Sequence, residues 1–142
     1  MTTFIFGSSA IALYLLGWVA YVLELTNRVR LKTSVIQLFT GLAIILHGFA
    51  SFGLLLHDGG LDLSLLKILS LLALVINSLV FLSGLKEPIH SLYLALLPIS
   101  VVTLVLALIS SSTKSTAVIP YSLQAHILTS ILAYSFLAIA AL

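Results

Sequence analysis

Cysteine is absent from this chain of 142 residues, and charged side chains are scarce. The lack of cysteine excludes disulfides, thiolate metal sites and cysteine nucleophiles, so histidine is left as the strong side-chain ligand for a metal. Six basic and four acidic side chains, with a net charge of +2, are too few to build a basic face for nucleic acid. We therefore expect no nucleic-acid partner.

Common enzyme motifs are also missing from the sequence. It contains no glycine-rich phosphate loop, no HExxH metal motif, and no serine in a convincing pattern with a histidine and a carboxylate. The expectation is a protein that is not an enzyme.

Apolar residues, by contrast, are abundant. They make up 61% of the chain, and the mean hydropathy is +1.30, which is more apolar than a soluble domain. A membrane-crossing helix needs about 20 apolar residues, and a lipid-exposed backbone must satisfy its own hydrogen bonds. We predict an all-α, polytopic integral membrane protein, a single domain of about five transmembrane helices with short loops. The expected spans are about 4–25, 35–56, 63–85, 88–109 and 119–142.

Prolines and chain ends refine this prediction. Pro88 suits the first turn of the fourth span, whereas Pro98 lies inside that span and is expected to kink it. The first span follows Met1 without a basic start, so we interpret it as a retained span rather than a cleaved signal. Leu142 ends the chain inside an apolar helix, which indicates the N-terminal part of a longer protein.

The distribution of lysine and arginine predicts the orientation, because cytoplasmic loops retain basic residues. Four basic residues follow the first and third spans, and two lie at the opposite level. We therefore expect the N-terminus outside. The first group is Arg28, Arg30, Lys32 and Lys86, and the second is Lys67 and Lys114.

Ionisable groups within a membrane span are functional candidates because their burial is costly. His47 lies near the middle of the second span. It is either a neutral imidazole hydrogen-bonded to a neighbouring helix or a ligand or proton relay. His126, early in the fifth span at the outer level, could ligate haem iron or simply cap the interface.

The other polar candidates are closer to the span ends. His57 is expected at the interface, and His90 as a residue flanking the fourth span. His57 and His126 share the outer level and could pair only if the second and fifth helices are neighbours. Lys67 is expected to extend outward toward Asp58 or Asp62, or to receive anionic groups together with Lys114, and Asn77 to join helices. His47 and His57 lie about 15 Å apart along one helix, which is too far to share a metal.

Residues 125–141, with the sequence AHILTSILAYSFLAIAA, resemble the histidine-bearing helix of cytochrome c assembly proteins. The likeness is to the CcsA and CcmC haem-handling superfamily, and within it to the YpjD-like inner-membrane branch. Leu63–Leu66, the following Ser70-Leu71, and Leu46-His47 match that branch in order and spacing. The resemblance covers essentially the whole chain but only the first half of the family, whose members have about eight spans.

This resemblance implies a multi-pass protein of the bacterial inner membrane that holds haem or passes it toward the periplasmic face. It implies that His126 is an axial ligand of the haem iron and that His47 marks an entry site for haem. The expected partners are the lipid bilayer, other membrane proteins and a haem-accepting protein. The cofactor expected from this resemblance is haem.

Two further interpretations of the residues remain open. One is a non-catalytic membrane subunit or scaffold that binds other membrane proteins through faces of small residues. The other is a small transporter in which His47 is a proton site, although the spans contain no buried carboxylate. Composition does not choose among the three interpretations.

Overall fold

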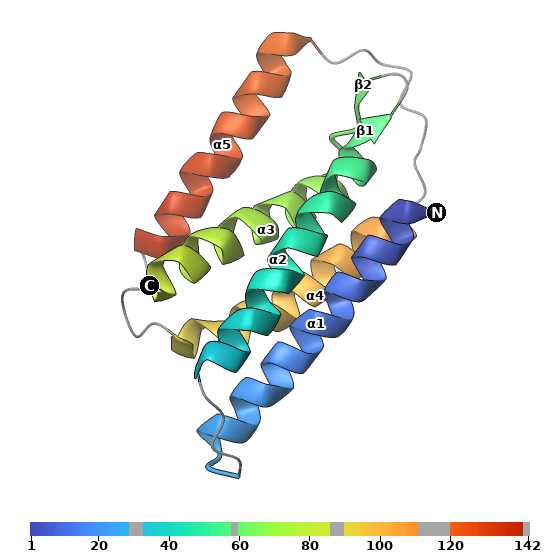
Figure 1. The fold of residues 1–142 in the computed structure, drawn as a ribbon. Coiled ribbons are helices and arrows are strands. Elements are labelled where there is room, and N and C mark those ends of the chain that lie inside the picture. Colours follow the sequence, from blue (N-terminus) through green and yellow to red (C-terminus); the bar gives the residue numbers. More distant parts are fainter. Residues whose placement is uncertain (29–32, 58–59, 86–89, 111–119, 141–142) are drawn as a thin grey trace.

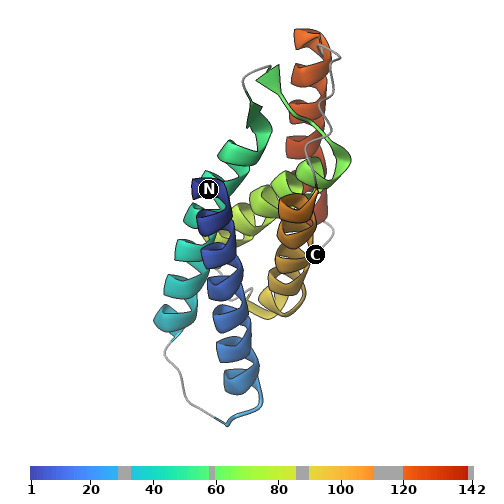
Figure 2. The same cartoon turned by 90° about the vertical axis from the view of Figure 1, so that its right-hand side faces the viewer.

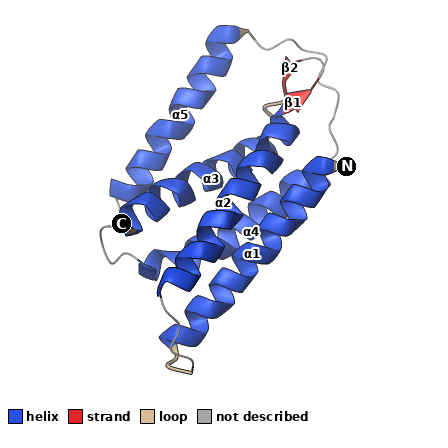
Figure 3. Ribbon diagram, in the orientation of Figure 1, coloured by secondary structure: helices blue, strands red, loops and turns tan. Residues whose placement is uncertain are grey.

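Five α-helices dominate the computed structural model of the chain, which describes residues 1–28, 33–57, 60–85, 90–110 and 120–140 (Figure 1). A 3-10 turn, η1, precedes the fourth helix, and two short antiparallel strands follow the second (Figure 3). The helices are α1 (Thr2–Leu25), α2 (Thr33–Leu55), α3 (Leu65–Gly84), α4 (Tyr93–Ile109) and α5 (Tyr121–Ala140). The short elements are β1 (Leu56–His57), β2 (Gly60–Leu61) and η1 (His90–Leu92).

The prediction of an all-helical protein with apolar helices long enough to cross a membrane is confirmed, but for fewer helices than predicted. Within the described residues, three helices are long and apolar enough to cross a membrane: Thr2–Leu25, Ser34–Leu55 and Leu65–Gly84. A fourth, α4, is apolar but has only 17 residues, because η1 precedes it as a tighter turn. Three candidate spans are fewer than the five that the sequence predicts.

Four of the helices form a closed group. Helix α1 packs against α2 and α4, and α3 packs against the same two helices from the other side. Helix α5 lies outside this group and packs on α3 (Figures 1 and 2). The two α5 side chains described as buried, Ile131 and Ser135, lie in its C-terminal half, and the described chain leaves its N-terminal half largely uncovered.

Burial in this fold is inverted relative to a soluble protein. The buried faces carry many small and polar residues beside a few large ones such as Leu97 and Leu104, while most large apolar side chains, such as Leu38, Phe52 and Ile109, are exposed. A continuous apolar exterior of this kind is tolerated in lipid and not in water. The buried polar or charged residues are Thr40, His47, Ser51, Lys67, Ser70, Asn77, Ser100 and Ser135.

Buried positions recur at steps of three and four residues along each helix of the group. In α1 they are Gly7, Ala10, Tyr14, Gly17 and Ala20, and the buried positions of α4 are also three or four residues apart. This spacing is typical of left-handed packing at a crossing angle of about 20°. Small residues on these stripes let the helix backbones approach closely.

Pro98 lies inside α4, as predicted, and the structure supplies the hydrogen bond that proline removes. Proline has no N–H, so the carbonyl four residues earlier, on Leu94, loses its helical donor. The indole Nε1 of Trp18 in α1 donates to that oxygen at 3.0 Å. The single tryptophan therefore ties α1 to α4 where the proline interrupts the helix.

Two glycines of α2 offer a matched test of the packing. A Cβ added at Gly41 would lie 3.0 Å from the ring of Phe81 in α3, whereas nothing lies within 4 Å of one added at Gly48. Both Gly→Leu changes gain similar helix propensity, so their difference reports on packing. We expect Gly41→Leu to destabilise the fold by about 1–3 kcal/mol.

Thermal unfolding of the detergent-solubilised variants checks this expectation. Gly48→Leu is the control and should unfold at or above the wild-type temperature. Equal unfolding temperatures for the two variants would contradict the α2–α3 contact at Gly41.

Candidate functional site

His47 lies at the centre of a hydrogen-bonded triad that joins three helices. The Tyr14 hydroxyl in α1 is 3.2 Å from His47 Nδ1, and the Ser70 hydroxyl in α3 is 2.9 Å from His47 Nε2. The Tyr14 and His47 rings meet edge to face at 5.8 Å. All three side chains are buried. The triad therefore connects α1, α2 and α3 in the middle of the group.

Both ring nitrogens of His47 are occupied by these bonds. One nitrogen of a neutral imidazole donates and the other accepts, and each neighbouring hydroxyl can take either role. The arrangement favours the interpretation of His47 as a neutral imidazole that joins helices. Binding of an iron at His47 would require one of the two bonds to break.

A second polar contact lies further along α3. Asn77 Nδ2 donates to the Ser100 hydroxyl in α4 and to the Ala73 carbonyl at 3.1 Å. The expectation that Asn77 joins helices is confirmed. Its Oδ1 has no hydrogen-bond partner in the described chain, and neither has Thr40 Oγ1 in α2, although both residues are fully buried.

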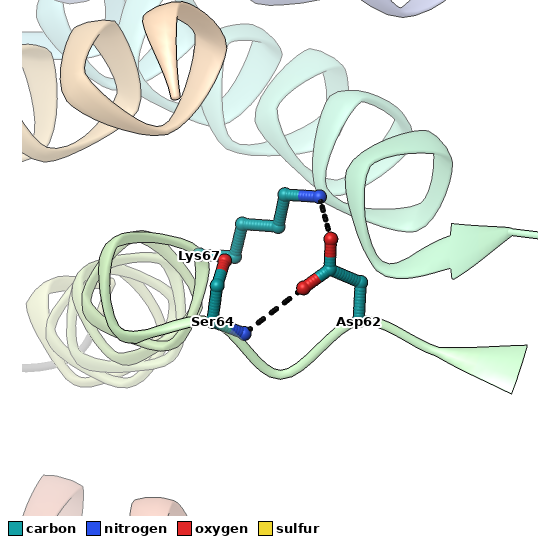
Figure 4. A network of polar contacts seen from close by, with 3 residues as sticks. All are labelled: Asp62, Ser64 and Lys67. Carbon is teal, nitrogen blue, oxygen red and sulfur yellow. Dashed lines mark hydrogen bonds and ion pairs between the residues drawn. The ribbon is translucent and has the colours of Figure 1, made fainter. Parts of the chain in front are cut away.

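A charged contact lies between β2 and the start of α3. Lys67 Nζ is 2.5 Å from Asp62 Oδ2, and the Ser64 backbone N–H donates to Asp62 Oδ1 at 3.1 Å (Figure 4). The predicted reach of Lys67 toward Asp62 is confirmed, but its side chain is buried rather than extended into water. Asp58, the alternative predicted partner, and Lys114, which was expected to receive anionic groups together with Lys67, lie outside the described residues.

This contact shifts the pKa of the Asp62 carboxyl. Partial burial raises its pKa, but the hydrogen bonds from Lys67 and Ser64 and the positive charge of Lys67 outweigh that effect. The result is a pKa below the ordinary value of 3.8. The Asp62 backbone N–H also donates to the Leu55 carbonyl at 2.8 Å, so the aspartate links the end of α2 to the start of α3.

His126 occupies a different environment on α5. Its side chain is exposed and makes no hydrogen bond within the described chain. Helical spacing puts His126 on the side of α5 opposite Ile131 and Ser135, the residues buried toward the group. Ala133 and Leu137, about two and three turns further along, continue the exposed face. An unpaired imidazole on this exposed face is therefore available to a ligand.

The remaining histidines do not extend this site. The side chains of His57 and His90 lie outside the described residues. The pairing considered for His57 and His126 needs α2 and α5 to be neighbours, whereas α5 packs mainly on α3. No group of three or more His, Cys, Asp or Glu residues gathers around a possible metal position in the described ranges.

Sequence reasoning identified His47 and Asn77 but not the residues that bind them. Tyr14, Ser70 and Ser100 were not among the candidates. These three residues stand three or four positions from small residues of their own helices. That spacing indicates a buried helix face and could have marked them as buried. Spacing does not say which residue of another helix lies opposite.

The triad predicts a measurable coupling between Tyr14 and His47. Tyr14→Phe removes one bond, and His47→Leu leaves two buried hydroxyls without a partner, which we expect to cost about 1–3 kcal/mol for each group. The double variant should be more stable than the sum of the single losses implies, with a coupling of about 0.6–1.7 kcal/mol. Unfolding of the four proteins in mixed detergent micelles measures that coupling.

Ser78→Ala is the matched control for this cycle, because the Ser78 hydroxyl bonds within its own helix to the Leu74 carbonyl. Its effect should add to that of His47→Leu. Strict additivity between Tyr14→Phe and His47→Leu would contradict the triad.

The Asp62 contact predicts a pH-dependent contribution to stability. A carboxyl whose pKa is lower in the folded state stabilises the fold above its unfolded pKa and loses that effect as the pH falls through the folded value. Asp62→Asn should therefore be less stable than wild type at neutral pH, and the difference should shrink below pH 3.8. Unfolding free energies measured as a function of pH check this. A difference that stays constant down to the lowest pH would count against the ion pair.

The chain was compared with protein families, curated proteins and solved structures. No protein-family model, no curated protein and no solved structure matches the chain.

Proposed function

We propose that all five helices cross a lipid bilayer, with η1 and α4 together forming one span, in a bacterial inner membrane with the N-terminus on the periplasmic side. The helix is nearly continuous from His90 to Ile109, which is about 30 Å at 1.5 Å per residue and so matches the hydrocarbon thickness. The inverted burial supports a lipid environment for the whole group. The basic residues support the orientation.

We further propose that the protein handles haem and uses His126 as an axial ligand of the haem iron. The observation that carries this proposal is the exposed, unpaired imidazole of His126 on an apolar helix. An ionisable side chain facing lipid is costly unless something covers it. A flat apolar macrocycle with an open iron coordination site covers both the face and the imidazole nitrogen.

The residues around His126 fit such a group. Thr129 and Ala133 are small, exposed and within two turns of the imidazole, so they leave room for a flat disc against the helix. The Thr129 hydroxyl donates to the Ala125 carbonyl at 2.9 Å and so presents its methyl group rather than an unpaired polar atom. Haem would supply the iron, and the protein would supply one nitrogen ligand and an apolar face.

His47 is less suited to this role. It is enclosed by three helices and hydrogen-bonded on both sides, so haem could reach it only by displacing Tyr14 or Ser70. The proposal therefore assigns haem to His126 alone among the described histidine side chains. Delivery to a haem-accepting partner from α5 would be favoured because this helix lies at the outside of the group.

The competing proposal is a scaffold that binds another membrane protein. The exposed apolar face of α5 supports this proposal as well as it supports haem binding. Large apolar side chains such as Tyr134, Phe136 and Leu137 are exposed there and could pack against another membrane protein. A scaffold would bind its partner without needing the His126 imidazole. The substitution of His126 therefore separates the two functions.

The test is a haem titration of the detergent-purified protein, followed by its Soret band. Wild type should bind haem, and His126→Ala should lose the band because the iron loses its nitrogen ligand. Free imidazole added to His126→Ala should restore much of the absorbance.

Leu132→Ala is the matched control, since Leu132 is exposed on α5 away from the His126 face. It should bind haem like wild type. A wild-type protein without a Soret band, or a band that His126→Ala leaves unchanged, would overturn the haem proposal.

A further inference from the structure

Polar atoms inside the four-helix group are arranged along a line rather than in one place. Along the buried face of α3, Lys67, Ser70 and Asn77 follow one another at intervals of one and two turns. The Asp62–Lys67 pair stands at the end nearest the strands, and the His47 triad follows. Ionisable side chains buried within a membrane helix bundle commonly mark ion or proton pathways, and both Lys67 and His47 are buried beside these polar groups.

The line continues beyond the triad on the facing helices. Helices α2 and α3 meet at His47 and Ser70 and again where Gly41 faces Phe81. Helices α2 and α3 therefore run antiparallel, and Thr40 and Asn77 are each seven residues from the bonded pair His47 and Ser70, so these two residues share a level. Asn77 bonds Ser100 of α4, and a Cβ added at Gly17 of α1 would lie 3.5 Å from Thr40 Oγ1. All four helices meet at this level.

Several atoms along the line lack the hydrogen bonds that burial demands. Thr40 Oγ1, Ser51 Oγ and Asn77 Oδ1 are buried and have no protein partner in the described chain. Such atoms are commonly satisfied by ordered water, which needs two or more polar partners within reach. Ser51 is one turn from His47 toward the strands, and Thr40 is two turns from it on the other side, so the orphaned atoms lie on both sides of the triad.

We propose that the interior of the four-helix group is a proton path, in which His47 relays protons between Ser70 and Tyr14 and water joins this triad to Ser51, Thr40 and Asn77. The Ser70 O–H bond breaks as its proton bonds to Nε2, and Ser70 takes a replacement proton from the water on its other side. The N–H bond at Nδ1 breaks as its proton bonds to the Tyr14 oxygen, and the Tyr14 hydroxyl releases its own proton to the next water. One proton enters and one leaves, and no electron is transferred. The imidazole ends in its other tautomer, and reorientation of the ring and both hydroxyls restores the starting hydrogen bonds before the next transfer.

The charged and titratable groups around His47 are compatible with this path. Tyr14 faces it from α1, and Lys67 lies one turn from Ser70 on α3. Asp62 neutralises Lys67, so the strand end of the path presents no net charge to an incoming proton. Tyr93 is buried on α4 toward the opposite end of the group. The path makes no use of His126, which is exposed on α5.

Proton flux into liposomes tests the proposal. The protein is reconstituted in vesicles that contain a pH-sensitive dye, and a potassium diffusion potential set with valinomycin drives proton entry. Wild type should acidify the interior faster than protein-free vesicles. His47→Gln keeps a donor and an acceptor between Tyr14 and Ser70 but cannot exchange a proton between them, so its flux should fall to the protein-free level.

Two conservative variants keep the result interpretable if His47→Gln fails to fold. Tyr14→Phe and Ser70→Ala each remove one hydroxyl of the triad and should each reduce the flux. Ser78→Ala, on the same helix as Ser70 but bonded only to the Leu74 carbonyl, should conduct like wild type. A wild-type flux equal to that of protein-free vesicles, or an undiminished flux in folded Tyr14→Phe and Ser70→Ala, would overturn the proposal.

Discussion

A polar group that is removed from water must find its hydrogen-bond partner inside the protein, and the rest of this structure follows from that constraint. Large apolar side chains cover the outside of the helices, so a polar side chain bonds either to a carbonyl of its own helix, as Ser78 does, or to another helix where the two meet. The His47 triad meets the requirement at the centre of the group by joining α1, α2 and α3. Asn77 and Trp18 join the remaining pairs, α3 with α4 and α1 with α4.

The same constraint distinguishes the two histidines of functional interest. His47 has satisfied its ring nitrogens within the four-helix group, so it can hold helices together and pass a proton between its partners. His126 has no such partner among the described residues, and it lies on a helix that packs on the group mainly through α3. The imidazole that is free of internal bonds is the one that can accept an external ligand.

Helix positions and several polar roles were predictable from composition and spacing. The expected span at 35–56 coincides closely with α2, and the pairing of Lys67 with Asp62 follows from their separation in sequence. The expected span from residue 88 differs from the structure, where α4 begins at Tyr93, because a 3-10 turn occupies His90–Leu92. Apolar content cannot distinguish the two kinds of turn, since both are formed by the same apolar residue types.

The sequence by itself determined that apolar helices would form and which rare polar residues would interrupt them, because hydropathy and helical spacing are local properties of the chain. Only the tertiary structure decided that Tyr14 and Ser70 meet His47, that Trp18 serves the carbonyl freed by Pro98, and that α5 packs on α3. These contacts join residues far apart in sequence. They depend on the order and rotation of the packed helices, which no single helix specifies.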